Sequence, residues 1–231
     1  MKILISGTSK GIGRYLAEYY SKDPGDTVFG CSRSDAGFDS NNYTHFKLDI
    51  SQPKDVSEMF STIRRSHGSI DVLINNAGIN ITPSPFMLVP PEKMREVFDV
   101  NFFAAVNMCR ESVKLMMSGS FGRIINIGSM AVKHEVEGET IYTASKSALT
   151  SFTRVLAKEV FKMGITCNMV SPSAIETDLS ENVNKEALQE VLNRNAINEY
   201  GIMEDVSNTI DWLILPTSGS VTGQVIYLGG V

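Results

Sequence analysis

Short runs of apolar residues alternate with longer segments of helical periodicity along this chain. Two of the runs, 72–74 and 124–127, are almost continuously apolar, which is typical of strands buried on both faces of a sheet. Strands separated by helices predict βαβ units, a parallel sheet and helices on both of its faces. The predicted strands span 2–6, 27–32, 71–76, 123–129, 165–173 and 224–230, and the predicted helices span 13–22, 53–66, 91–117 and 143–162, with two further helical stretches between 173 and 224.

No linker, repeat or low-complexity tract divides the chain, so we expect residues 1–231 to form a single α/β domain with a doubly wound sheet. The length of 231 residues is sufficient for one large buried core. Hydrophobic residues make up 42% and charged residues 20%, as in an ordinary soluble protein. The net charge of −5, with both signs mixed along the chain, disfavours nucleic acid and anionic membranes as partners. A small-molecule partner is therefore expected.

The chain has three cysteines, Cys31, Cys109 and Cys167, which are far apart and embedded in apolar runs. This pattern predicts small core residues rather than disulfides or metal ligands, and it indicates a reducing compartment. The N-terminal apolar run is too short for a secretory signal, and no stretch reaches the ~18 apolar residues of a membrane span. We therefore expect a cytoplasmic protein without a metal site.

A glycine cluster follows the first predicted strand, in the stretch "GTSKGIG" that contains Gly7, Gly11 and Gly13. Glycines at a strand-to-helix turn let the backbone approach a pyrophosphate, and the helix N-terminus offers free N–H groups and a positive dipole end. The G-x-x-x-G-x-G spacing differs from the commoner G-x-G-x-x-G. Its position after the first strand favours dinucleotide binding over a plain turn.

The second predicted strand ends in "CSRS", where an NAD site usually carries an acidic residue for the ribose 2′-hydroxyl. Arg33 and Ser32 supply a cation and a hydroxyl that suit a 2′-phosphate, and Lys10 in the glycine loop adds a second positive charge. These residues favour NADP(H), with NAD(H) as the alternative. In a second interpretation, Arg33 and Lys10 are solvated surface charges.

Six motifs in order resemble the short-chain dehydrogenase/reductase family, whose fold is Rossmann-like, over nearly the whole chain. They are the glycine loop, "LDI" with Asp49, "NNAG" at 75–78, "DVNFFA" with Asn101, "INIGSM" with Ser129, and the Y-x-x-x-K pair of Tyr142 and Lys146 thirteen residues after that serine. The resemblance implies an oxidoreductase that transfers a hydride between nicotinamide and a carbonyl or secondary alcohol. The further cofactor contacts that it implies are Ser9, Ile12, Ile50, Asn76, Ala77, Gly78, Pro172, Ser173, Ile175 and Thr177.

The same resemblance implies a catalytic role for four residues. Tyr142 is expected to be the general acid in reduction and the base in oxidation, although a free phenol has a pKa of about 10. Lys146, one helical turn on, together with the oxidised nicotinamide, is expected to lower that pKa and to bind the nicotinamide ribose. Ser129 is expected to hold the substrate oxygen, and Asn101 a water that refills the proton chain.

Two positions depart from the family pattern. Ser173 stands where a glycine is usual, so the backbone near Ile175 and Thr177 is open to question. Gly229 stands where an Asp or Asn is usual, in a tail that stops almost at once. That tail often joins an oligomer contact in relatives; we still expect a homo-oligomer, a dimer or tetramer.

The substrate is not named by the sequence. The segments 130–141 and 180–201 are rich in polar residues, which favours a small polar substrate if they line the pocket. In the alternative interpretation they face solvent, and His134 is either a substrate contact or a surface residue. Three other candidates are considered. The first is a 3-oxoacyl carrier-protein reductase, for which only Arg123 and Lys162 offer basic docking residues. The others are a non-catalytic NADP-binding protein and a sugar-nucleotide epimerase of the longer related type, whose extra substrate domain this chain is too short to hold.

Overall fold

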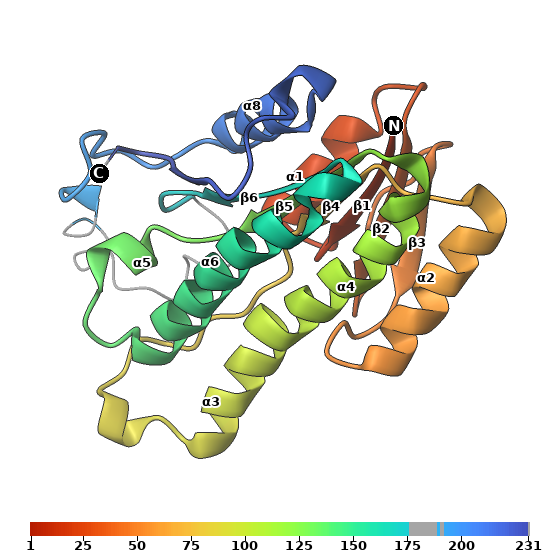
Figure 1. Cartoon of the computed structure of the whole chain (residues 1–231). Coiled ribbons are helices and arrows are strands. Elements are labelled where there is room, and N and C mark those ends of the chain that lie inside the picture. Colours follow the sequence, from red (N-terminus) through yellow and green to blue (C-terminus); the bar gives the residue numbers. More distant parts are fainter. Residues whose placement is uncertain (176–188, 190–191, 231) are drawn as a thin grey trace.

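The computed structural model describes residues 1–175, 189 and 192–230, and these form a parallel sheet flanked by helices (Figure 1). The strand order is β3-β2-β1-β4-β5-β6-β7. The chain therefore winds outward in one direction from β1 to β3 and in the other from β4 to β7, which is the doubly wound, Rossmann-like arrangement predicted. The strands are β1 (Lys2–Ser6), β2 (Thr27–Ser32), β3 (Tyr43–Lys47), β4 (Val72–Asn75), β5 (Gly122–Ile127), β6 (Ile165–Ser171) and β7 (Val225–Tyr227).

Alternate residues of each central strand enter the two cores on opposite faces of the sheet. In β1, Ile3 and Ile5 pack on one face and Leu4 on the other, and all three are fully buried. The helices α1 (Gly11–Tyr20) and α8 (Met203–Ile214) cover the face of Ile3 and Ile5. The opposite face is covered by α2 (Pro53–His67), α4 (Ala105–Met116) and α6 (Thr140–Val160).

One strand in the structure is absent from the prediction. The strand β3 spans Tyr43–Lys47, pairs with β2 and forms the edge of the sheet. Its sequence, YTHFK, is mostly polar, and none of its residues is fully buried. Unlike β7, the other edge strand, β3 lacks the apolar run by which the strands were predicted, and an edge position allows polar residues because only one side of the strand pairs with the sheet.

The helix predicted over 91–117 is interrupted. It consists of α3 (Pro91–Phe98), a π-helix η2 (Asp99–Ala104) and α4. A π-helix keeps the apolar spacing close enough to that of an α-helix to escape notice in sequence, and such insertions often occur at functional sites. The remaining short elements are η1 (Phe86–Leu88), η3 (Met117–Gly119), α5 (Ala131–His134), η4 (Phe161–Met163) and η5 (Pro216–Ser218).

The carboxyl ends of β1 and β4 mark the point where the strand order reverses. Ile5 pairs with Gly30 of β2 on one side and with Ile74 of β4 on the other, so the three strands end side by side. Loops that leave such adjacent strands in opposite directions open a crevice, the usual ligand site of doubly wound sheets.

Candidate active site

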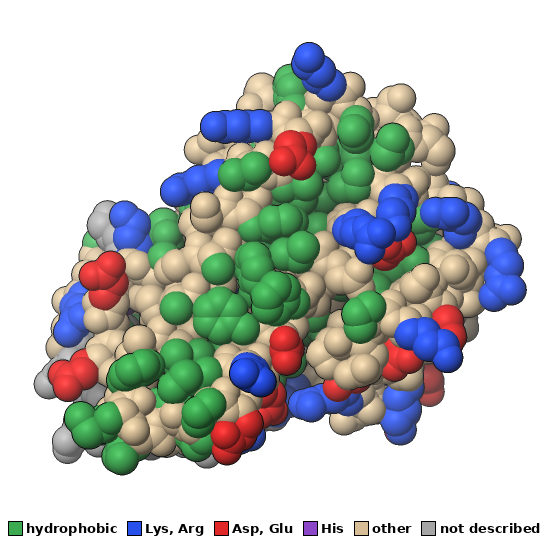
Figure 2. All heavy atoms as spheres, turned by 60° about the horizontal axis from the view of Figure 1, so that its bottom comes forward, with side chains coloured by type: hydrophobic (Ala, Val, Ile, Leu, Met, Phe, Trp, Pro, Cys, Tyr) green, Lys and Arg blue, Asp and Glu red, His purple; other side chains and the backbone are tan. Residues whose placement is uncertain are grey.

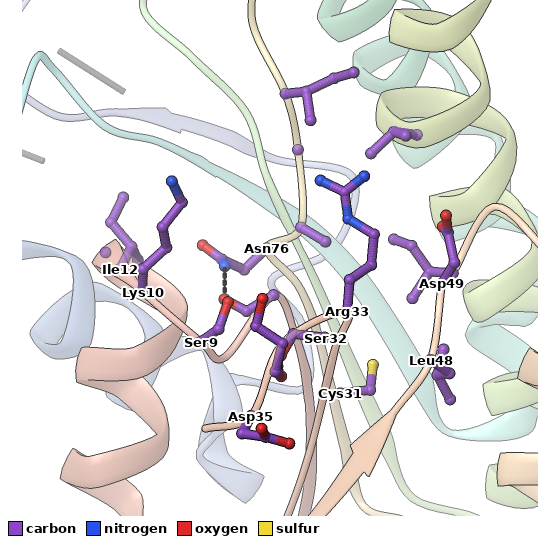
Figure 3. Close-up of a pocket in the computed structure, with 18 of the residues that line it drawn as sticks. Ser9, Lys10, Ile12, Cys31, Ser32, Arg33, Asp35, Leu48, Asp49 and Asn76 are labelled. Carbon is purple, nitrogen blue, oxygen red and sulfur yellow. Dashed lines mark hydrogen bonds between the residues drawn. The ribbon is translucent and has the colours of Figure 1, made fainter. Parts of the chain in front are cut away.

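A cavity of about 550 Å³ lies in this crevice (Figure 3). It is lined by the loops that follow β1, β2 and β4 and by the segment after β3. Most of the predicted cofactor residues meet here, although they come from segments far apart in the sequence. They are Gly7, Ser9, Lys10, Gly11, Ile12, Ser32, Arg33, Asp49, Ile50, Asn76, Ala77 and Gly78.

The glycine loop is folded so tightly that side chains are excluded. A Cβ on Gly13 would lie 2.2 Å from the Gly7 carbonyl oxygen and 2.3 Å from the Asn76 Nδ2, and Gly7 itself has φ = +77°. The Asn76 amide closes the loop by donating to the carbonyl oxygens of Ser6 at 3.0 Å and Gly7 at 3.3 Å. Gly13 therefore packs α1 against the loop rather than lining the cavity.

The N-terminus of α1 points its backbone N–H groups toward the cavity. Its N-cap residue, Lys10, makes no side-chain capping hydrogen bond. The first turn of a helix has N–H groups without intrahelical partners, which bind phosphate well. The loop, the helix end and the exclusion of side chains therefore fit a dinucleotide pyrophosphate.

One end of the cavity carries the positive charges. Figure 3 shows the Lys10 and Arg33 side chains extending in the same direction from opposite sides, with Asp35 away from the Arg33 guanidinium. Arg33 is exposed, and among the described residues it forms no ion pair or side-chain hydrogen bond. The Ser32 hydroxyl, by contrast, is buried and donates to the Ser34 carbonyl oxygen at 2.6 Å. Arg33 is therefore the better placed of the two predicted residues to receive a phosphate.

At the other end of the cavity, Gly78 lies close to two predicted catalytic residues, Lys146 and Asn101, which do not line the cavity themselves. A Cβ on Gly78 would lie 3.4 Å from the Lys146 Nζ and 3.3 Å from the Asn101 Oδ1. Lys146 is almost fully buried and donates to the Ile127 carbonyl oxygen at 2.9 Å. Burial lowers the pKa of Lys146 to about 8.

The Asn101 amide bridges two segments. It accepts from the Ile79 backbone N–H at 2.8 Å and donates to the Ile79 carbonyl oxygen at 2.9 Å and to the Ser145 Oγ at 3.1 Å. Ser145 in turn donates to the Tyr142 carbonyl oxygen at 2.7 Å. Asn101, which lies in the π-helix, thus ties the loop after β4 to the N-terminal part of α6.

Tyr142 and Ser129 lie on adjacent segments, Ser129 just after β5 and Tyr142 near the start of α6. Burial raises the pKa of Tyr142 to about 12, the charge of Glu139 adds to the rise, and a hydrogen bond with Ser129 opposes it. With this raised pKa, Tyr142 is protonated at neutral pH. The Lys146 Nζ lies 5.9 Å from the Tyr142 ring centroid and donates to Ile127. The lowering expected from Lys146 together with the oxidised nicotinamide stays a prediction.

The turn after β6 lies outside the lining of the cavity. The Pro172 carbonyl oxygen accepts from the Met130 backbone N–H at 3.3 Å, which joins the turn to the segment after Ser129. Ile175 is buried in the core that contains α1 and α8. Thr177 lies outside the described residues, so its predicted role stays untested.

Comparisons with known proteins agree with this geometry. The family model "short chain dehydrogenase" matches residues 1–188. The chain belongs to the short-chain dehydrogenase family. It is 31% identical to the 3-oxoacyl-acyl-carrier-protein reductase FabG of Buchnera aphidicola, over 98% of this chain and 95% of that protein.

Two solved structures resemble the dehydrogenase closely. An aldohexose dehydrogenase of Thermoplasma acidophilum matches with a TM-score of 0.88 and 25% identity, covering 99% of this chain and 92% of the other. A 4-hydroxyisoleucine dehydrogenase complexed with NADH matches with a TM-score of 0.86 and 27% identity, covering 99% and 97%. The protein is therefore an oxidoreductase acting on CH–OH or carbonyl groups. In the described part of the dehydrogenase, no helix combines the length and the apolar character needed to cross a bilayer.

The two departures of the dehydrogenase from the family pattern lie against each other. A Cβ on Gly229, where φ is +109°, would lie 3.2 Å from the Ser173 Cβ and 3.2 Å from the Asn195 Nδ2. Ser173 accepts from that Nδ2 at 3.0 Å. A side chain at 229 would contact Ser173 closely and would have to adopt a positive φ, so the two replacements lie in one tightly packed place.

His134 is not an exposed surface residue but is hydrogen-bonded within the protein. Its Nε2 lies 2.7 Å from the Asn195 Oδ1, and since an amide oxygen only accepts, Nε2 is the donor. Arg194 donates to the His134 carbonyl oxygen at 3.0 Å. His134 is a partly buried residue that links α5 to the 192–197 segment.

Sequence reasoning missed a polar pair near Tyr142. Asn80 lines the cavity, and its Nδ2 donates to the Glu139 Oε1 at 3.2 Å. Burial raises the pKa of Glu139. Their closeness to predicted motifs could have indicated this pair in the sequence, because Asn80 follows "NNAG" by two residues and Glu139 precedes Tyr142 by three. Further lining residues that the sequence did not indicate are Cys31, Ser34, Asp35, Leu48, Ile79 and Val100.

Proposed function

We propose that this enzyme uses NADP(H) and acts on a small polar substrate. It either reduces a carbonyl group or catalyses the reverse reaction, the oxidation of an alcohol. The observation that carries the cofactor choice is the exposed Arg33 guanidinium beside the cavity, without a partner among the described residues. A buried or paired arginine would leave no cation for a 2′-phosphate. The relative complexed with NADH keeps NAD(H) as the alternative.

In the proposed mechanism, bound nicotinamide supplies or accepts the hydride, and the protein supplies the proton. Tyr142, protonated at neutral pH, donates its phenolic proton to the substrate oxygen in reduction. Ser129 holds that oxygen by a hydrogen bond. Lys146, beside Gly78, binds the nicotinamide ribose, while Asn101 fixes the loop that carries Ile79 so that both remain in place.

The proposed substrate carries hydroxyl groups. The Asn80 amide and the Glu139 carboxylate form a partly buried polar pair next to the proton donor, and they can accept hydrogen bonds from a polyhydroxylated ligand. The name of the aldohexose dehydrogenase indicates a substrate of the same kind, and that of the 4-hydroxyisoleucine dehydrogenase a small polar one.

A second candidate is a 3-oxoacyl carrier-protein reductase, which the 31% identical relative supports. This candidate needs basic residues on the surface to dock an acidic carrier. Arg123, one of the two considered from sequence, is 3% exposed and donates to the carbonyl oxygens of Gly122 at 2.9 Å and Leu215 at 3.2 Å. Because the Arg123 guanidinium is buried and hydrogen-bonded within the protein, it cannot dock an acidic carrier. Of the two basic residues considered, Lys162 is then the one that could do so.

The proposed enzyme is a homo-oligomer that associates through α4 and α6. Figure 2 shows hydrophobic side chains gathered across the face that carries these helices. Phe103 beside α4 and Val155 on α6 are more than half exposed, with 58% and 53% of their surface accessible. Large exposed apolar patches mark protein interfaces more often than free surface.

The proposal is tested first with cofactors and then with substrates. NADPH is expected to bind at least about tenfold more tightly than NADH, as one charge-assisted contact provides. A panel of keto-sugars, small hydroxyketones and 3-oxoacyl thioesters is then assayed with NADPH. Turnover of a hydroxylated ketone, reduced at least about a hundredfold by Tyr142→Phe while NADPH binding is retained, supports the proposal. Tighter NADH binding rejects the cofactor choice, and exclusive turnover of thioesters selects the second candidate.

A further inference from the structure

A histidine on the edge strand lies against the turn that carries Arg33. The His45 Nε2 is 2.9 Å from the Ser34 carbonyl oxygen and 3.3 Å from the Ser32 Oγ. His45 therefore contacts the residue on each side of Arg33. Of the side chains described on β3, it is the one that reaches both.

The direction of the His45 hydrogen bond follows from its partner. A carbonyl oxygen only accepts, so the Nε2 carries a proton and donates to Ser34. The other ring nitrogen, Nδ1, lies 2.8 Å from the Tyr43 hydroxyl. Both nitrogens of His45 therefore have a partner in the same cluster.

The same cluster reaches the glycine loop. The Tyr43 hydroxyl donates to the Thr8 Oγ1 at 2.9 Å, and Thr8 is fully buried next to Gly7. A Cβ on Gly30 of β2 would lie 2.0 Å from the Tyr43 oxygen. The Tyr43 hydroxyl therefore occupies space that is available only because residue 30 is a glycine. Tyr43 and His45 thus connect the loop expected to hold the pyrophosphate with the turn expected to hold the 2′-phosphate.

From this geometry we propose that His45 is a positioning residue for cofactor selection. By fixing the Ser34 carbonyl, it holds the backbone of the turn so that the Arg33 guanidinium stays at the cavity rather than in solvent. This inference rests on the proposed NADP(H) preference. A rotamer-rich arginine on an unsupported turn loses conformational entropy when it binds a phosphate, and a fixed backbone reduces that loss.

Two substitutions separate the two nitrogens of His45. An Asn side chain places its polar atoms near the Nδ1 and cannot reach Ser34, whereas a Gln side chain reaches the Nε2 position and can still donate to Ser34. The dissociation constants of NADP⁺ and NAD⁺ are measured by isothermal titration calorimetry. We expect His45→Asn to reduce the preference for NADP⁺ over NAD⁺ about fivefold, and His45→Gln to restore most of it. A purely structural role would weaken both cofactors equally.

Arg33→Ala, alone and combined with His45→Asn, tests whether His45 acts through Arg33. We expect Arg33→Ala to reduce the preference at least about tenfold, and His45→Asn to add nothing further to it. The matched control is His67→Asn, because His67 lies at the exposed end of α2, and its preference is expected to equal that of the wild type.

The possible outcomes have distinct meanings. If Arg33→Ala reduces the preference and His45→Asn does not, the role of His45 is rejected and the proposed function stands. An equal loss for both cofactors, or the same loss in His45→Gln as in His45→Asn, also rejects it. If Arg33→Ala leaves the preference unchanged, the proposed NADP(H) site is wrong and the inference fails with it.

Discussion

The two ends of the cavity are built differently. At the Lys146 end the functional groups are buried and committed, since the Lys146 ammonium donates to Ile127 and the Asn101 amide is bonded to Ile79 and Ser145. At the Arg33 end the guanidinium is exposed and has no partner among the described residues. Replacing a buried group that is bonded to its neighbours disturbs the arrangement of the site, whereas an exposed group is exchanged with little effect on stability. We infer that the residues at the Lys146 end determine the type of reaction, and that the Arg33 end determines which cofactor is preferred.

The largest effect that tests this contrast is expected from Lys146→Met. Loss of the ammonium should reduce kcat by at least about a hundredfold, because the ribose contact and the charge beside Tyr142 are both removed. The free energy of unfolding at pH 7 should rise by about 1 kcal/mol, because burying the ammonium is costly. Steady-state kinetics and urea denaturation measure the two quantities.

The pH dependence of stability provides the control for this variant. The pKa of Lys146 is lowered on folding to about 8, so between pH 8 and its ordinary value of 10.5 the unfolded chain binds more protons than the folded protein. Wild-type stability therefore gains a contribution as pH rises through this window, and Lys146→Met lacks it. A variant less stable than the wild type at pH 7, with an unchanged pH slope, would contradict the cost assigned to the buried charge.

An intermediate effect is expected at the other end. Arg33→Ala should weaken NADPH binding at least about tenfold and leave NADH binding, kcat with NADH and the free energy of unfolding nearly unchanged. Calorimetric titration, kinetics and denaturation give the three values. A large loss of stability would mean that Arg33 is part of the folded framework, and the contrast between the two ends would be lost.

The smallest effect is expected from Glu139→Gln. The Glu139 charge raises the pKa of Tyr142, so its removal lowers that pKa and increases the phenolate fraction at any pH below it. Since alcohol oxidation needs the phenolate as base, kcat for oxidation at pH 8 should increase about twofold, while KM for a hydroxylated substrate rises. Asp99→Asn, at the start of η2, serves as the charge-matched control. A decrease in oxidation kcat would contradict this sign.

Much of the fold could be predicted because the central strands are buried on both faces. Their continuous apolar runs, such as 72–74, cannot be confused with exposed strands, and the glycine loop identifies the first crossover. The edge strand β3 escaped because pairing on one side lets polar residues such as Thr44 and His45 occupy it. The π-helix around Asn101 escaped because the segment 99–104 contains no Gly or Pro to interrupt the helical stretch.

For the site, the order of the motifs predicted which residues would meet but not how each would be bonded. The Ser129 and Tyr142 segments adjoin as expected, but the order of the motifs does not show that burial raises the pKa of Tyr142 or that Lys146 donates to Ile127. The bond of His134 to Asn195 joins residues 61 positions apart. No local pattern encodes a contact of that kind, since it depends on the packing of α5 against the 192–197 segment.

The burial of the cysteines has a practical consequence for studying the protein in solution. Cys31, Cys109 and Cys167 are unpaired and buried, and burial raises the pKa of the first two to about 12 and that of Cys167 well above its usual range. Thiols in this state react slowly with alkylating reagents. The wild-type chain is thus a natural background for site-specific fluorescent labelling, in which a single cysteine introduced on the exposed side of β3 can report cofactor binding directly.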